Sequence, residues 1–109
     1  MTPTPIPPLC PMLAIRNAAA AMDWYQRALN ATEIMRLSDP AGTVLHGELQ
    51  LGRGLLMLAE ENPAFNTSPQ TVGKTTVILN LVVEDVNSLF AQAVAAGAKE
   101  IFPLKDQFY

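Results

Sequence analysis

The stretch LAIRN at residues 13–17, followed by AAAAMDWYQRALN at residues 18–30, decides the fold because the chain contains a second copy of it. The second copy reads LVVED at residues 81–85 and continues to Gly97. Each copy joins a short apolar run, a capping residue, an amphipathic run and a turn residue. The repeat is longer than the period of a solenoid, so we interpret it as two copies of one module that contains a βαβ unit.

Both copies predict a helix with local start and stop signals. In the first copy, Asn17 suits the N-cap and Asn30 tolerates the left-handed conformation that ends a helix. In the second copy, Asp85 and Gly97 take these two roles. The predicted helices therefore cover residues 18–29 and 86–96. Their apolar faces are Ala21, Tyr25, Ala28 and Leu29 in the first, and Val86, Leu89, Phe90, Ala93 and Val94 in the second.

Strands are expected on both sides of these helices. The pattern predicts them near residues 11–15, 33–37, 43–51, 55–59 and 76–83, and from residue 101 onward. Residues 52–54, Gly-Arg-Gly, predict a tight hairpin between the third and the fourth. Alternation in the third strand puts one set of side chains on each face. One set is Val44, His46, Glu48 and Gln50, and the other is Leu45, Gly47, Leu49 and Leu51.

We interpret the whole chain, residues 1–109, as a single domain. Module one covers residues 9–60 and reads β-α-β-β-β, residues 61–75 form a polar connector, and module two covers residues 76–109. The equivalent of the hairpin that closes module one would begin after Tyr109. We therefore expect module two to lack its last two strands and to leave sheet edges open.

Composition excludes several classes of function. Half of the residues are hydrophobic, the net charge is −3, and no cluster of Lys and Arg occurs, which argues against a nucleic-acid partner. The single cysteine, Cys10, excludes an internal disulfide framework. Residues 1–8 do not read as a signal peptide, and no apolar run approaches the roughly 20 residues that span a membrane. We expect no membrane association and a cytoplasmic location.

The sequence resembles the vicinal oxygen chelate superfamily, and within it the PhnB-like branch of the glyoxalase/bleomycin-resistance/dioxygenase family. The segments that carry the resemblance are residues 20–29 (AAMDWYQRAL), 46–49 (HGEL), 68–73 (SPQTVG), 83–86 (VEDV), 95–98 (AAGA) and 103–109 (PLKDQFY). The resemblance implies an α+β fold. Two βαβββ modules would form a curved mixed sheet, or cup, with the helices on its outer face. It also implies a homodimer, because relatives commonly pair their modules.

Metal enzymes of this superfamily take one ligand from each of four strands. The resemblance and the repeat assign those positions to Cys10, Met57 and Ile78, with the fourth beyond Tyr109. A cysteine thiolate can bind metal, whereas Met and Ile do not suit a hard divalent ion. We therefore expect no metal site of the family type and no cofactor, with a divalent metal as the alternative.

A set of polar side chains is expected inside the cup. If the leucines of the third strand face the helices, then His46, Glu48 and Gln50 point into the cup, and Asn80 joins them from the strand at 76–83. Convergent polar groups in an apolar concavity are typical of a small-molecule pocket. The candidate ligand-binding residues are His46, Glu48, Gln50, Asn80, Met57 and Cys10.

Three functions remain open at this stage. The first is a protein that binds a small molecule in the cup without a metal. The second is a metal-dependent lyase, isomerase or dioxygenase of the same fold, with the metal held partly by His46 and Glu48. The third is a non-catalytic interaction fragment. Whether the protein is an enzyme, and which ligand it binds, are not decided by the residues.

Overall fold

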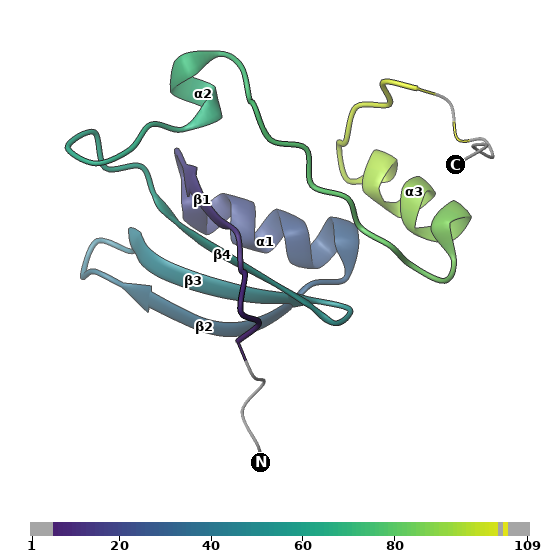
Figure 1. Ribbon diagram of the computed structural model, residues 1–109, viewed down its shortest axis with the longest axis horizontal. Helices are drawn as coiled ribbons and strands as arrows, with labels where there is room; N and C mark the ends of the chain where they lie inside the picture. Colours follow the sequence, from purple (N-terminus) through teal and green to yellow (C-terminus); the bar gives the residue numbers. More distant parts are fainter. Residues whose placement is uncertain (1–5, 103, 105–109) are drawn as a thin grey trace.

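The computed structural model describes residues 6–102 and residue 104 of the 109-residue chain. Its elements in chain order are β1 (Met12–Ile15), α1 (Ala18–Leu29), β2 (Thr32–Ser38), β3 (Val44–Leu51), β4 (Gly54–Glu60), α2 (Pro69–Val72) and α3 (Val86–Ala95). The strands form one open sheet in the order β1-β4-β3-β2, in which β1 and β4 are parallel and the other neighbours antiparallel. Helix α1 lies across one face (Figure 1). The expected α+β class with a mixed sheet is confirmed.

Helix α1 begins and ends where its capping residues predict. The side chain of Asn17 accepts a hydrogen bond from the backbone N–H of Ala20, and Asn30 adopts the left-handed conformation with φ of 57°. A side chain of β4 also caps the start of this helix. The two carboxylate oxygens of Glu60 accept hydrogen bonds from the backbone N–H groups of Asn17 and Ala18 at 2.9 and 3.0 Å. These bonds occupy donors that the first turn of a helix leaves free.

The hydrophobic core lies between α1 and the sheet. Its buried members are Ile15, Ala18, Met22, Ala31, Val44, Leu49 and Leu58. Met22 is the central side chain of the helix in this core, and its solvent exposure is 0%. The predicted apolar face of α1 omitted Met22. Gly47 of β3 faces Met22, since a Cβ at this position would lie 2.6 Å from the Met22 sulfur.

A β-bulge changes the predicted faces of β3. Leu37 pairs with His46, but the next residue, Ser38, pairs with Val44, so Leu45 is an extra residue in the strand. The expectation that Val44 shares a face with His46 is therefore wrong, because the bulge turns Val44 into the core. Leu45, which was expected to face the helix, is 52% exposed for the same reason.

The second module differs from the expectation. Residues 76–83 do not form the predicted strand, because no other strand among the described residues lies beside them to complete a ladder. Ile101 and Phe102 form a bend rather than a strand, and most of the segment that follows lies outside the described residues. Helix α3 is present and begins after Asp85, whose side chain accepts a hydrogen bond from the Ser88 N–H.

Helix α3 packs against α1 and not against a described strand. The indole Nε1 of Trp24 donates a hydrogen bond to the carbonyl oxygen of Ala96 at 2.8 Å. The side-chain amide of Gln92 donates to the carbonyl of Arg27 and to the side-chain oxygen of Asn30, at 2.9 and 2.8 Å. Figure 1 shows α3 beside α1 and away from the four strands. Without a strand at 76–83, the sheet does not extend beneath α3.

The predicted connector, residues 61–75, contains the short helix α2. Ser68 is its N-cap and accepts a hydrogen bond from the N–H of Thr71, while Pro69 follows at the first helical position. The carboxylate of Glu61 accepts hydrogen bonds from the Ser68 N–H at 2.7 Å and from the Thr71 hydroxyl at 2.9 Å. These bonds lower the pKa of Glu61, the bond from Ser68 most strongly. The same hydrogen bonds hold the first turn of α2, which packs against β1.

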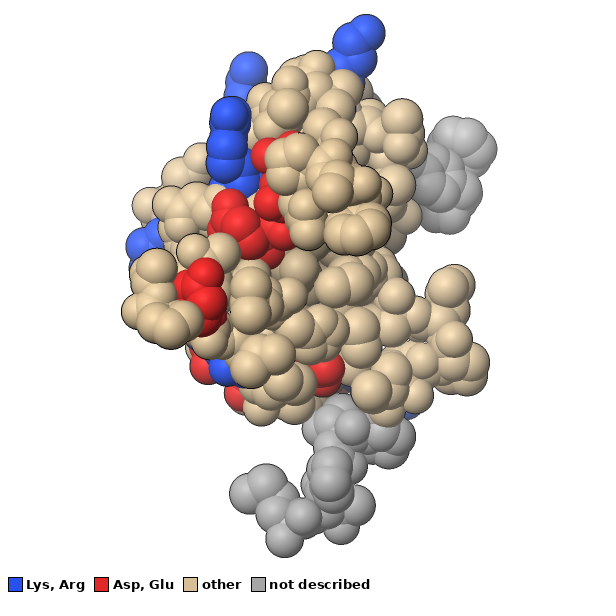
Figure 2. Space-filling view, turned by 90° about the vertical axis from the view of Figure 1, so that its left-hand side faces the viewer, with Lys and Arg blue, Asp and Glu red and all other residues tan. Residues whose placement is uncertain are grey.

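The surface mixes charges of both signs. On the side of the molecule shown in Figure 2, acidic side chains gather at mid-height. Lys and Arg side chains lie above them and at the outline of the molecule. Within the part of the chain that the structure describes, no helix is long and apolar enough to cross a membrane.

Candidate functional site

The face of the sheet opposite α1 carries a row of side chains that crosses all four strands. Met57 of β4 pairs with Met12 of β1 on one side and with Glu48 of β3 on the other. Glu48 in turn pairs with Met35 of β2. Residues that pair directly across strands point to the same face, and the neighbouring Leu58 and Leu49 point into the core. The row therefore lies on the face that α1 leaves open, which we call the open face.

Glu48 and His46 form the polar centre of the open face. The Nε2 atom of His46 lies 2.8 Å from a carboxylate oxygen of Glu48. The side chain of Glu48 is only 12% exposed, and that of His46 is 28% exposed. A carboxylate in this position has remaining acceptor sites for a donor on a bound molecule. The three methionines around it offer polarizable, adaptable surface.

Cys10 and Gln50 lie near the β3–β4 hairpin rather than beside the pair. The thiol of Cys10 donates a hydrogen bond to the carbonyl oxygen of Leu55 at 3.2 Å. Gln50 pairs with Leu55 across the strands, and its side-chain amide donates to the carbonyl of Gly52 at 3.0 Å. The β-alternation puts the Gln50 side chain on the open face, one row away from Glu48, whereas Cys10 precedes β1.

Asn80 is not brought together with the other candidates. It lies in the segment that does not form a strand, and it lines a separate hollow of about 540 Å³ with residues of the N-terminal arm, the β3–β4 hairpin and α1. Ile78, at the family ligand position, is 84% exposed. The expectation that Asn80 faces the cup depended on the strand at 76–83 and is wrong with it.

The donor set does not fit a metal site of the family type. Of the assigned positions, Cys10 bonds to a backbone carbonyl, Met57 lies in the row on the open face, and Ile78 has no donor atom. His46 and Glu48 are two adjacent donors. Among residues 6–102 and 104, no third His, Cys, Asp or Glu completes a group that could hold a metal ion. Structural and catalytic metal sites ordinarily use three or four protein ligands.

Sequence reasoning missed Met35 and a second concavity. Met35 joins the open face because a second bulge, between Glu33 and Met35, shifts its register, and no local pattern signals a bulge here. The second concavity, of about 640 Å³, lies along β1 between α1 and residues 67–77. The segment SPQTVG at residues 68–73 carried a local signal for one wall of this concavity, because Ser followed by Pro predicts the start of a helix.

The fold and the sequence together define the class of this protein. Residues 10–109 match the Glyoxalase/Bleomycin resistance protein/Dioxygenase superfamily, and the chain belongs to that family. The crystal structure of TioX from Micromonospora sp. ML1 is similar in fold, with a TM-score of 0.65 and 23% sequence identity. That similarity covers 93% of this chain and 80% of the TioX chain.

Two mycobacterial proteins are similar in sequence. The uncharacterized protein Mb0911c of Mycobacterium bovis is 34% identical over 107 residues, which are 94% of this chain and 70% of that protein. The uncharacterized protein Rv0887c of Mycobacterium tuberculosis is also 34% identical over 107 residues, and there the match spans 63% of its length. The chain thus spans about two thirds of the length of these relatives.

Proposed function

We propose that this protein binds a small molecule on the open face of its sheet, without a metal site of the family type. The observation that carries the proposal is the position of Glu48. Its side chain is 12% exposed, is bonded to His46, and lies between Met35 and Met57 on the face of the sheet opposite α1. An apolar surface with one oriented polar pair suits an apolar molecule that carries a hydrogen-bond donor.

The methionines of the chain provide a built-in test. Protein labelled with ¹³C at the methionine methyl groups has probes on the open face at Met12, Met35 and Met57, and a buried control at Met22. A library of small molecules is added, and binding is measured from methyl shifts and from the rise in melting temperature. We expect a ligand that shifts the three open-face signals and leaves Met22 nearly unchanged.

Two variants sharpen the test. Glu48→Gln removes the charge of the polar centre, whereas Glu84→Gln removes a charge from an exposed carboxylate with no bonded partner among the described residues. Loss of one charge-assisted hydrogen bond costs about 1.5–3 kcal/mol, so Glu48→Gln should weaken binding by roughly 10- to 150-fold. Glu84→Gln should leave it unchanged. If every ligand shifts Met22 as strongly as Met57, or binds Glu48→Gln equally well, the proposal fails.

The metal-dependent enzyme is a second candidate, and the short contact between His46 and Glu48 is the observation in its favour. A divalent ion would need further ligands from solvent or from the substrate, and it would act as a Lewis acid there. Elemental analysis of protein purified without chelator decides between the two candidates. Stoichiometric Ni, Zn, Mn or Fe that disappears in His46→Ala would overturn the metal-free proposal and favour a lyase, isomerase or dioxygenase.

We also propose that the protein forms a homodimer in the cytoplasm and that it belongs to the PhnB-like branch. The support for the dimer is the apolar segment 76–83, in which Ile78 is 84% and Val82 is 94% exposed. Contiguous apolar surface of this kind marks interaction sites. Light scattering on the purified chain should give twice the monomer mass, and Ile78→Ser with Val82→Ser should halve it. A monomer with a cooperative melt would contradict the dimer.

A further inference from the structure

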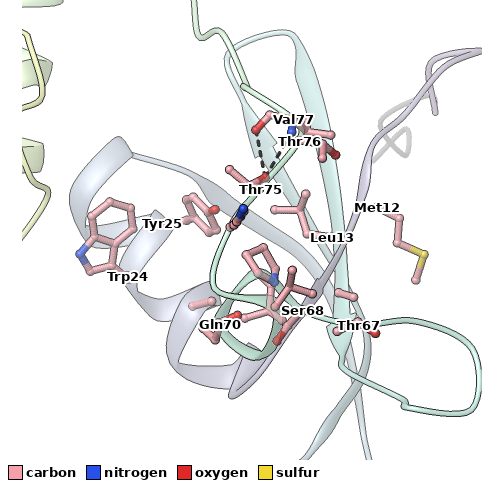
Figure 3. Close-up of a pocket in the computed structure, with 16 residues that line it drawn as sticks. Met12, Leu13, Trp24, Tyr25, Thr67, Ser68, Gln70, Thr75, Thr76 and Val77 are labelled. Atoms are coloured by element: carbon pink, nitrogen blue, oxygen red, sulfur yellow. Dashed lines mark hydrogen bonds between the residues drawn. The ribbon is translucent and has the colours of Figure 1, made fainter.

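The open face carries three methionines in one row. Met35 and Met57 lie on either side of Glu48, and Met12 follows Met57 on the next strand. Figure 3 shows the side chain of Met12 directed away from Tyr25 of α1, toward the open face. Three of the five methionines of the chain therefore lie on one face of the sheet.

Packing of the core does not account for this row. The core methionine, Met22, is fully buried, whereas Met12 is 55% and Met35 is 40% exposed. Exposed methionines give up the free energy that burial of an apolar side chain provides. Their sulfur atoms are, however, accessible as ligands, and the unbranched side chain with three rotatable bonds can turn its sulfur toward a neighbour.

The sulfur atoms of Met35 and Met57 can meet above Glu48. The two methionines lie on β2 and β4, with only β3 between them. Neighbouring strands are about 4.8 Å apart, so the two backbones are separated by about 10 Å at this row. Extended methionine side chains can cover this distance from both ends.

His46 adds a nitrogen donor at the same place. Its Nε2 atom lies 2.8 Å from a carboxylate oxygen of Glu48, and an ionised carboxylate only accepts, so Nε2 carries a proton. In a neutral imidazole Nδ1 is then unprotonated, and it has no hydrogen-bond partner among the described residues. Histidine ligands of metals ordinarily donate their other N–H to a carboxylate or a carbonyl, which fixes the tautomer and the orientation of the ring.

Two thioethers and one imidazole form a soft donor set. Thioether ligands select Cu(I), and imidazole also suits copper, whereas Mg²⁺, Ca²⁺ and Mn²⁺ prefer oxygen ligands. Zn²⁺ is ordinarily bound by three or four His, Cys, Asp or Glu side chains. Residues 6–102 and 104 contain no group of three such side chains. The donors on the open face therefore favour Cu(I) over the divalent ions.

We propose that the open face binds one Cu(I) ion through the sulfur atoms of Met35 and Met57 and the Nδ1 atom of His46. Met12, beside Met57, is a further sulfur donor. Glu48 is a positioning residue, because it acts through its bond to His46. The proposal goes beyond small-molecule binding and does not rest on it.

Copper binding is tested on the complete chain under anaerobic conditions. Cu(I) is delivered as its acetonitrile complex, and its affinity is measured by competition with the chelator ferrozine. We expect the protein to bind a single equivalent. In protein labelled with ¹³C at the methionine methyl groups, the signals of Met35 and Met57 should shift and that of Met22 should not. Cu(I) has a filled d shell, so the signals stay sharp.

Substitutions of methionine by leucine remove the sulfur and nearly conserve the volume. Loss of an outer partner of a metal site typically costs 10- to 100-fold in affinity, so loss of a ligand in Met35→Leu or Met57→Leu should weaken Cu(I) binding by about tenfold or more. Met22→Leu is the matched control in the core and should bind Cu(I) as the unchanged protein does. Melting followed by circular dichroism checks that each variant is folded.

Glu48 separates this proposal from the small-molecule proposal. Glu48→Ala should weaken Cu(I) binding by about tenfold, because His46 loses the acceptor that orients its ring. Glu48→Gln should recover most of this loss, because the amide oxygen still accepts the Nε2 proton. Binding of a small molecule is expected to weaken in Glu48→Gln, so either proposal can fail without the other.

Three results would overturn the copper site. The first is the absence of Cu(I)-dependent shifts at Met35 and Met57 in the unchanged protein. The second is an unchanged affinity in the folded double variant Met35→Leu with Met57→Leu. The third is loss of binding in Cys10→Ser while both methionine variants bind normally, which would assign the copper to the thiol. We expect Cys10→Ser to retain the site.

Discussion

Gly47 of β3 lies directly beneath Met22 of α1, and the contact leaves no room for a methyl group. A Cβ on Gly47 would lie 2.6 Å from the sulfur of Met22, 2.9 Å from its methyl carbon and 3.2 Å from Leu58. Helix and sheet are this close because the strand has no side chain at the point where Met22 enters the core.

Gly47→Ala should therefore destabilise the protein by about 1–3 kcal/mol, the usual cost of overpacking a core. The measurement is urea unfolding followed by circular dichroism. Met22→Ala alone should cost about 2–5 kcal/mol through the cavity it leaves. In the double variant the added methyl group lies in the cavity left by Met22. The double variant should therefore be destabilised by less than the sum of the two single variants. Strict additivity would show that the two residues do not interact.

Glu60→Ala should destabilise α1 from a distance in sequence. The carboxylate accepts hydrogen bonds from the N–H groups of Asn17 and Ala18 at the start of the helix. Bonds to a charged acceptor are worth about 1.5–3 kcal/mol, and their loss leaves two donors of the first turn free. Thermal unfolding should show the loss, and Glu60→Gln should recover part of it because the amide retains one acceptor oxygen. Equal melting temperatures for all three proteins would refute the capping role.

Acid should loosen α2 before it unfolds the sheet. The pKa of Glu61 is lowered below its ordinary value of 4.5, first by the bond from the Ser68 N–H and then by the Thr71 hydroxyl. A lowered pKa in the folded state means that the stabilisation is complete above about pH 4.5 and is lost as the pH falls through the folded pKa. Amide exchange at Ser68 and Thr71 should therefore accelerate in that range. Glu61→Gln should remove this pH dependence, and Glu84→Gln should retain it.

Helix α3 should detach without unfolding the rest of the molecule. Trp24→Phe removes the hydrogen bond to Ala96, and Gln92→Ala removes those to Arg27 and Asn30. Each neutral bond is worth about 0.5–1.5 kcal/mol. Amide exchange in residues 86–95 should become faster in both variants and fastest in the double variant. Exchange in β3 and β4 should be unchanged, and a uniform acceleration would mean that α3 is part of one cooperative unit with the sheet.

Local signals made α1 and the β3–β4 hairpin predictable. Asn17 and Asn30 act on their own neighbours in sequence, so the bounds of α1 agree with the prediction at both ends. The period of two in β3 places His46 and Glu48 on one face, as the register shows. Their role in binding stays a prediction.

Features that depend on distant partners could not be predicted. The bulge at Leu45 arises in the pairing of β3 with β2. It moves the Val44 side chain to the core face, and no pattern in the local sequence predicts it. A strand at residues 76–83 needs a second strand beside it, however strong the β-propensity of its residues. The position of Asn80 depended on that strand. The capping of α1 by Glu60 joins positions 42 and 43 residues apart in the chain.

The bulge at Leu45 has a consequence for how this chain can change over evolutionary time. Loss of one residue from a regular strand moves every following side chain to the opposite face. At Leu45, β3 already contains one residue more than its partner β2. Deletion of Leu45 would therefore make the pairing of Ser38 with Val44 regular without moving His46 or Glu48 to the other face. Length variation among homologous strands should therefore be tolerated at this position, while a deletion at Gly47 would exchange the core with the open face.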